Sequence, residues 1–187
     1  MGKDKSRLTV DGQSFVDLIS KQLSSITSKV TLVGAAGSDS SLPRVADVYG
    51  EWGALGGVHA ALAACSAGAA IVVACDFPFV TRALFQTLAD ASENFDAVAP
   101  IQADGIPQPL CAFYRVNPCL QQTEALIKSG ERRPIALLQS VRTRWLQFGE
   151  VAKLENASRF FDNINTPEDY DRITGKGSNT GNAGPQS

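Results

Sequence analysis

A carboxylate at the end of an apolar run is the first candidate for chemistry in this sequence. Asp76 follows AAIVVAC (69–75), which is apolar at every position. Such a run is typical of a parallel strand covered on both faces, and open α/β sheets bind ligands beyond the carboxyl ends of their strands. Because Mg²⁺ takes one or two carboxylates together with phosphate oxygens and water, Asp76 is a candidate magnesium ligand. An Asp that caps the turn before Pro78 explains the same residues, and both interpretations stay open.

A glycine-rich stretch, EWGALGGVHAAL (51–62), is the second candidate. Glycines in a turn that leads into a helix let backbone N–H groups approach a flat base or a phosphate closely. A plain tight turn uses the same residues. Asp47, at the end of a weak strand, is expected to face the same edge. The chain has no GxxxxGK[ST] sequence, which excludes nucleotide binding in the P-loop manner.

The amino end, MGKDKSRLTVDG (1–12), carries a compact group of cations: Lys3, Lys5 and Arg7. A polar loop of this kind can reach a phosphate when it follows a strand, but no strand precedes it here. Composition alone favours a solvated run of charges. His59 is the only histidine and has no second His or Cys at ligand spacing, so we expect it to pack or to cap rather than to catalyse.

Strands alternate with helices along the chain, which predicts an α/β fold of three layers with a mostly parallel sheet. Helices are expected at 14–26 with Ser14 as N-cap, 57–66, 82–91 with Thr81 as N-cap, 118–129, 133–140, and from Asn165 onward. Strands are expected at 29–34, 44–47, 69–75, 95–101, 107–116 and 142–148. The prolines of 107–116 place it at an edge or in an irregular position. The polar tail 174–187 is expected to be disordered, which leaves a domain of residues 1–173.

Bulk properties exclude several classes of protein. The 187 residues and the net charge of −2 fit one globular domain. The apolar runs are too short to span a membrane, and no secretory signal opens the chain. The near-neutral balance argues against a general nucleic-acid binder. Four cysteines without CxxC spacing indicate reduced thiols in a cytoplasmic protein.

Six motifs occur in one order along the chain: MGKDK (1–5), Asp47 with GALGG (53–57), ACDFPF (74–79), QPLCAFYR (108–115), GERRP (130–134) and NINTPEDY (163–170). This series resembles the molybdenum cofactor guanylyltransferase family, which has a nucleotidyltransferase fold related to the Rossmann type. The similarity runs from residue 1 to about 173. The glycine turn and the NTPED element are shared widely among nucleotidyltransferases, whereas GERR and QPLCAFYR point more narrowly to the guanylyl branch.

The resemblance implies an Mg²⁺-dependent enzyme that joins GMP from GTP to the terminal phosphate of molybdopterin and releases pyrophosphate. Its partners would be GTP, the molybdenum cofactor, and proteins that supply or receive that cofactor. Because the attacking oxygen belongs to the pterin phosphate, the protein must supply charge neutralisation and in-line placement rather than a nucleophile. Cytidylyl transfer to the same cofactor, and a non-catalytic homologue that binds a nucleotide or a protein, are the alternatives.

Residue roles follow from the resemblance by position. Asp76 would hold the magnesium ion, and Lys5 would lie on the phosphates and stabilise the departing pyrophosphate. Asp47 would contact the guanosine end. The backbone that would assist it belongs to Gly53, Leu55 and Gly57.

Two further elements would serve the second substrate. Asn163 and Asn165 would help to hold the metal–phosphate or pterin side, and Arg132, with Arg133, would meet the pterin phosphate. Helix capping by Asn165, and solvated charges at a helix start for the two arginines, explain the same residues.

The start of the chain departs from the family pattern. In the family, an apolar strand ending in LAGG and a loop with a basic residue precede MGxDK. We therefore expect that about 10–20 residues are absent, enough for a strand of ~5 and a glycine loop. A start upstream of Met1, which we favour, and a shortened gene product are the two explanations. Loss of a central strand would leave unpaired backbone edges on both of its neighbours.

Overall fold

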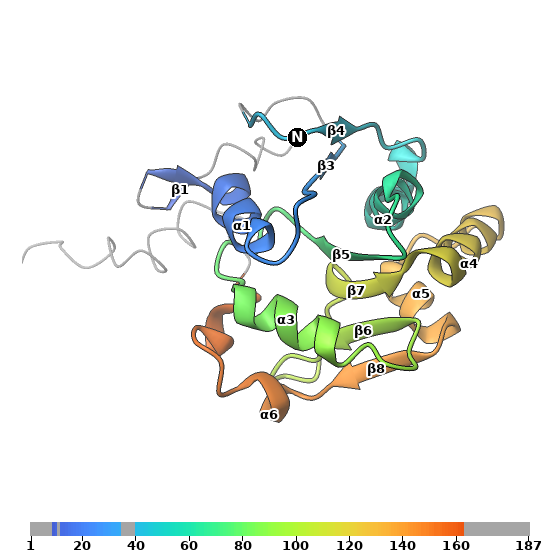
Figure 1. Ribbon diagram of the computed structural model, residues 1–187. Helices are drawn as coiled ribbons and strands as arrows, with labels where there is room; N and C mark the ends of the chain where they lie inside the picture. The colour runs from blue at the N-terminus through green and yellow to red at the C-terminus, as the bar shows by residue number, and fades with distance from the viewer. Residues whose placement is uncertain (1–8, 11, 35–39, 163–187) are drawn as a thin grey trace, which may run out of the picture.

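The computed structural model describes residues 9–10, 12–34 and 40–162 (Figure 1). Lys5, Asn163, Asn165 with its expected helix, and the tail 174–187 lie outside the described residues. The helices are α1 (Phe15–Ser24), α2 (Gly53–Ala64), α3 (Arg82–Asp90), α4 (Val116–Lys128), α5 (Pro134–Ser140) and α6 (Phe148–Val151), with 3-10 turns η2 (Gly50–Trp52) and η3 (Ala157–Arg159). The strands are β1 (Thr9–Val10), β2 (Gln13–Ser14), β3 (Leu32–Val33), β4 (Arg44–Val45), β5 (Ala69–Val73), β6 (Ala97–Pro100), β7 (Cys111–Arg115) and β8 (Thr143–Leu146).

Side-chain caps set the starts of two helices as expected. The Ser14 hydroxyl accepts from the Asp17 N–H at 3.1 Å, and the Thr81 hydroxyl accepts from the Leu84 N–H at 3.4 Å. Helix α2 begins four residues before its expected start at residue 57. Gly53, with φ +56°, makes the bend between η2 and α2, so the glycines that follow it lie inside the helix rather than in a turn before it.

The main sheet has four strands in the order β5-β7-β6-β8. β6 and β8 are parallel, whereas β7 is antiparallel to both β5 and β6. The expectation of a mostly parallel sheet is therefore wrong, and the sheet is mixed. The physical reason is the short loop between β6 and β7, which a bridge between Ile101 and Pro107 closes and in which Gly105 has φ +86°. A return this short reverses the direction of the chain.

The position expected for β7 is also wrong. β7 lies between β5 and β6, and its first four residues are buried. Pro107 and Pro109 come before the strand, so they remove no N–H group from it and do not confine it to an edge. The hydroxyl of buried Tyr114 donates to the Pro109 carbonyl at 2.6 Å, which ties this loop to the strand.

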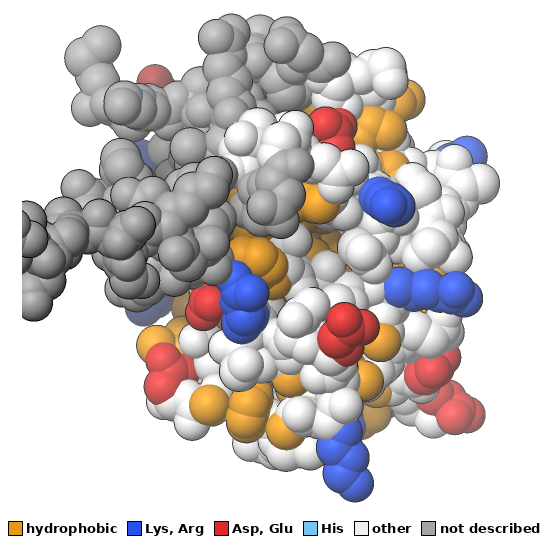
Figure 2. All heavy atoms as spheres, turned by 90° about the vertical axis from the view of Figure 1, so that its left-hand side faces the viewer, with side chains coloured by type: hydrophobic (Ala, Val, Ile, Leu, Met, Phe, Trp, Pro, Cys, Tyr) orange, Lys and Arg blue, Asp and Glu red, His pale blue; other side chains and the backbone are white. Residues whose placement is uncertain are grey.

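Helices cover both faces of the sheet, which confirms the three layers. Val98 and Phe113 point to the face covered by α1 and α3, and Ala99 and Tyr114 point to the face covered by α2, α4 and α5. On the face drawn in Figure 2, the described Lys and Arg side chains are interspersed with Asp and Glu and form no broad patch of one sign. Within the described residues, the structure has no helix of the length and apolarity that a membrane span requires.

The strands β3 and β4 form a separate parallel pair (Figure 1). Among the described strands, β5 pairs only with β7, and each of its five residues is half-buried. The expectation of a parallel strand fully covered on both faces is therefore wrong for β5. Its second edge faces β3 without pairing to it.

Candidate active site

Asp76 lies where the chain leaves β5. The Ala74 N–H donates to the Leu110 carbonyl at 2.7 Å, which holds the end of the strand beside the segment that enters β7. Phe77 and Val80 then bury their side chains, so the turn is anchored in the core. The Asp76 side chain is half-buried, and its Oδ1 atom has almost no exposure to solvent. A carboxylate is thus held at the mouth of the strand.

Asp47 follows β4 and closes the turn that leads toward α2. Its Oδ1 atom accepts from the Tyr49 N–H at 2.9 Å, which closes a turn of the Asx type. Gly56 packs against this turn: a Cβ atom there would lie 2.4 Å from the Tyr49 carbonyl oxygen and 3.1 Å from Asp47 Oδ1. Only glycine lets the helix and the turn approach this closely. The sequence prediction named Gly53 and Gly57 and missed Gly56, although its place in GALGG was a signal.

One hollow of about 290 Å³ brings these elements together. Asp47 and Gly57 line it on one side, Cys75 at the end of β5 lines it on another, and Gly34 after β3 borders it. The carboxylate of Asp47 and the start of α2 therefore share a hollow with the strand end that carries Asp76. The Leu55 side chain is fully buried in the core, so only the backbone of Leu55 is available to a ligand.

Arg132 and Arg133 have partners within the chain. The Arg132 guanidinium lies 5.0 Å from the centre of the Trp52 ring, and its Nη1 donates to the Glu51 carbonyl at 3.0 Å. Arg133 pairs with Glu131, with Nη2 2.7 Å from Oε2 and Nε 3.0 Å from Oε1. The Arg133 side chain, followed by the N–H groups of Arg133 and Arg132, lowers the pKa of the Glu131 carboxyl to about 2. The Arg132 side chain thus packs against η2, next to the start of α2, and does not line the hollow.

His59 and two of the thiols lie in the interior. His59 packs between α2 and α4, edge-on to Tyr49 at 4.8 Å between ring centres, and its Nε2 is 3.8 Å from Glu124 Oε1. Burial raises the pKa of the Cys119 thiol to about 12, and burial also raises the pKa of Cys111. These thiols are protonated at neutral pH and supply no nucleophile.

The described residues contain no group of three or more His, Cys, Asp and Glu side chains that could hold a metal ion. Mg²⁺ does not require such a cage, because it is usually bound by one or two carboxylates together with substrate phosphates. Asp76, with its shielded Oδ1 atom at the end of β5, fits that mode. Asp76 directly follows Cys75, which lines the hollow, and it is the residue that we consider for the metal.

A three-layer α/β fold with carboxylates at the ends of β4 and β5 and a glycine-rich helix start between them defines the class: a nucleotide-binding α/β domain. The family model described as "MobA-like NTP transferase domain" matches residues 1–144. The chain belongs to this family of nucleotidyltransferases.

Relatives agree with this assignment. The chain is 28% identical to a probable molybdenum cofactor guanylyltransferase of Pelotomaculum thermopropionicum, over 97% of this chain and 90% of the relative. It is 31% identical to a protein of the same name from Methanothermobacter thermautotrophicus, over 90% of each. The solved structure of molybdopterin-guanine dinucleotide biosynthesis protein A from Archaeoglobus fulgidus superposes with a TM-score of 0.77 at 23% identity, over 94% of this chain and 91% of that one, which shows the same fold. These matches give no support to the expectation that a strand and a glycine loop are missing.

Proposed function

We propose that this chain transfers GMP from GTP to the terminal phosphate of molybdopterin. Family membership, with relatives named guanylyltransferases that match nearly the whole chain, carries the proposal. The geometry supports it, because Asp47 and Gly57 border one hollow that reaches the carboxyl ends of β3 and β5, where α/β sheets bind their ligands.

The reaction is a substitution at phosphorus. An oxygen of the pterin phosphate attacks the α-phosphorus of GTP, a new P–O bond forms, and the bond to the bridging oxygen breaks so that pyrophosphate leaves. The protein contributes alignment and charge neutralisation. Asp76 would bind Mg²⁺, which supplies the neutralisation of the phosphate charge when it is present. The turn that carries this carboxylate is anchored in the core by Phe77 and Val80.

Asp47 is proposed to recognise the base. The bond from the Tyr49 N–H to Oδ1 fixes the carboxylate in place, and a carboxylate has lone pairs left after one such bond. Asp47 can therefore accept from the N1–H and the exocyclic amine of guanine. The backbone at Gly53 and Gly57, where a Cβ atom would have nothing within 4 Å, would lie against the nucleoside.

The remaining roles stay predictions. We predict that Lys5 contacts the phosphates and that Asn163 and Asn165 contact the metal–phosphate or pterin side. These three residues lie outside the described part of the structure. Arg132 would have to meet the pterin phosphate while its guanidinium lies over Trp52.

Calorimetric titration of GTP and of CTP, each with Mg²⁺, tests the proposal. We expect GTP to bind in preference to CTP and Asp76→Asn to lose most of that affinity. Asp104→Asn is the matched control, because Asp104 is an exposed loop carboxylate that an amide can replace as acceptor for the Ile106 N–H. Preference for CTP would indicate cytidylyl transfer. Unchanged GTP affinity in Asp76→Asn would contradict the assignment of the metal ligand.

A further inference from the structure

His59, the only histidine of the chain, is buried on helix α2 with 7% of its surface exposed. Its Nδ1 atom has no hydrogen-bond partner within the described residues. Buried polar atoms without a partner are rare in folded proteins, so each one calls for an explanation. The neighbours of this ring provide one.

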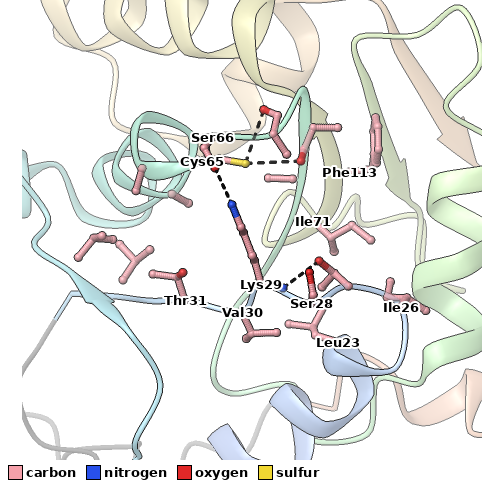
Figure 3. A pocket seen from close by; sticks show the side chains of 18 of the residues that line it. Leu23, Ile26, Ser28, Lys29, Val30, Thr31, Cys65, Ser66, Ile71 and Phe113 are labelled. Atoms are coloured by element: carbon pink, nitrogen blue, oxygen red, sulfur yellow. Dashed lines mark hydrogen bonds between the residues drawn. The ribbon is translucent and has the colours of Figure 1, made fainter.

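Helix α2 has two faces with different surroundings. One face carries small residues that line the hollow of the candidate site or a second hollow beside it: Ala54, Gly57, Ala61 and Ala64. The second hollow, of about 570 Å³, reaches the end of the helix, where Cys65 and Ser66 line it (Figure 3). His59 lines neither hollow and lies on the side of α4, where Glu124 Oε1 is 3.8 Å from its Nε2. His59 can therefore affect a ligand in the hollow only through a neighbour.

That neighbour is Tyr49. The rings of His59 and Tyr49 meet edge to face, with 4.8 Å between their centres and 84° between their planes, a geometry that stabilises aromatic pairs beyond the burial of their surface. The N–H of the same Tyr49 donates to Asp47 Oδ1 at 2.9 Å. The ring of Tyr49 thus lies against His59 while its backbone holds the Asp47 carboxylate.

The Asp47 turn has one hydrophobic anchor. Val48, in the middle of the turn, is 76% exposed, and the residues that flank the turn, Ala46 and Gly50, are exposed as well. Tyr49 is half-buried, and its ring packs against the core cluster that α2 shares with α4 and α5. Because a surface turn with few buried contacts opens readily, the packing of the Tyr49 ring decides how firmly the Asp47 carboxylate is held.

We propose that His59 is a positioning residue for base recognition: its ring holds Tyr49, and the Tyr49 N–H in turn directs the Asp47 carboxylate toward the guanine. This inference rests on the role proposed above for Asp47. Guanine presents a ring N–H and an exocyclic amine side by side, whereas cytosine has an exocyclic amine without a ring N–H beside it. Loss of the His59 ring should therefore weaken the binding of GTP and leave the binding of CTP unchanged.

Calorimetric titration of GTP and of CTP, each with Mg²⁺, into the full 187-residue chain tests this selectivity. We expect His59→Ala to lower the affinity for GTP by about threefold to tenfold, the range of an aromatic pair, with the affinity for CTP unchanged. His59→Phe keeps an aromatic ring against Tyr49 and should recover most of the loss. Leu62→Ala, which removes a fully buried side chain three residues further along α2, is the control and should leave the ratio of the two affinities unchanged.

A double-mutant cycle separates positioning from a general effect on the fold. In the Asp47→Asn background, His59→Ala should change the affinity for GTP by less than about twofold, because the carboxylate that His59 positions is absent and the two effects do not add. Should His59→Ala fail to fold, Tyr49→Leu removes the same ring contact from the other side and keeps the N–H that Asp47 accepts. It should give the same selective loss of GTP and the same dependence on Asp47.

Amide hydrogen exchange gives a readout that needs no nucleotide. The Tyr49 amide is bonded to Asp47 Oδ1, so its exchange reports how often the turn opens. We expect this amide to exchange about threefold or more faster in His59→Ala than in the native chain. In His59→Phe and in Leu62→Ala its rate should stay native.

Three results would overturn the proposal. The first is a native rate of exchange at the Tyr49 amide in His59→Ala. The second is an equal loss of affinity for GTP and for CTP, and the third is an equal loss of GTP affinity with and without the Asp47 carboxylate. A native chain that shows no preference for GTP would instead contradict the proposed function, whereas faster exchange at the Tyr49 amide in His59→Ala would still support the hold of His59 on the turn.

Discussion

The guanidinium of Arg132 lies 5.0 Å from the centre of the Trp52 ring, and Arg132 Nη1 also bonds the Glu51 carbonyl at 3.0 Å. This contact joins the loop between α4 and α5 to η2, a segment 81 positions earlier in the chain. Because α2 begins directly after Trp52, these two contacts of Arg132 hold the segment that leads into the glycine-rich start of α2.

Replacing Arg132 by Gln should weaken the contact between the α4–α5 loop and η2. An exposed cation–π contact is worth about 0.5–1 kcal/mol, so we expect a loss of about 1 kcal/mol in the free energy of unfolding and weaker binding of GTP. The emission of Trp52, read in a Trp145→Phe background, should change because the cation leaves the ring. Arg132→Lys, which keeps the charge, should recover part of the effect, and Arg142→Gln is the exposed control. Unchanged Trp52 emission in Arg132→Gln would contradict the contact.

Gly56 and Gly57 are adjacent in the chain, but only Gly57 has room for a side chain. A Cβ atom at Gly56 would lie 2.4 Å from the Tyr49 carbonyl oxygen, whereas a Cβ atom at Gly57 has nothing within 4 Å. Gly56→Ala should therefore destabilise the chain by about 1–3 kcal/mol. Gly57→Ala should be neutral or stabilising by up to about 1 kcal/mol, because alanine favours the helix. Urea unfolding of both variants measures the difference, and equal stabilities would contradict the packing of α2 on the Asp47 turn.

Local signals predicted the helices well. The caps Ser14 and Thr81 act on N–H groups three residues away, so sequence neighbours alone specify those helix starts. Strand order was not predictable in this way. The chain reverses between β6 and β7 through a bridge at Ile101 and Pro107, and an apolar run such as AAIVV does not reveal whether its neighbour is parallel.

The sequence also predicted where two carboxylates of the candidate site lie in the fold. Asp47 and Asp76 follow strands, and strand ends mark ligand sites in α/β sheets, so their positions could be foreseen. The contact of Arg132 with Trp52 and the fit of Gly56 under Tyr49 could not, because each depends on the distance between segments that the fold brings together. The sequence also did not reveal that the side chain of Leu55, a predicted binding residue, is buried in the core.

Asp47 has two separable roles that two substitutions distinguish. Asp47→Asn keeps an acceptor for the Tyr49 N–H, so stability should stay within about 0.5 kcal/mol of the native chain. It also replaces the charged acceptor with an amide, so GTP affinity should fall by about tenfold. Asp47→Ala removes both functions and should cost about 1 kcal/mol of stability in addition. Thermal unfolding and GTP titration check these outcomes, and native GTP affinity in Asp47→Asn would exclude Asp47 from base recognition.

The titration of the Glu131 carboxyl group tests whether Arg133 is paired with it in the GERR loop (130–133). The side chain of Arg133, then the N–H groups of Arg133 and Arg132, lower the pKa of Glu131 from 4.5 to about 2. Since the folded pKa lies below the ordinary value, the ionised carboxylate stabilises the loop above about pH 4.5, and that contribution disappears as the pH falls through about 2.

Carboxyl ¹³C chemical shifts followed against pH should therefore give a Glu131 midpoint near 2 in the native chain. In Arg133→Gln the midpoint should rise toward 4.5 without reaching it, because the two backbone donors remain. Arg142→Gln should leave the midpoint unchanged. A native midpoint near 4.5 would show that Arg133 is not held by Glu131 in solution, and Arg133 would then be available to an anionic substrate without first breaking an internal ion pair.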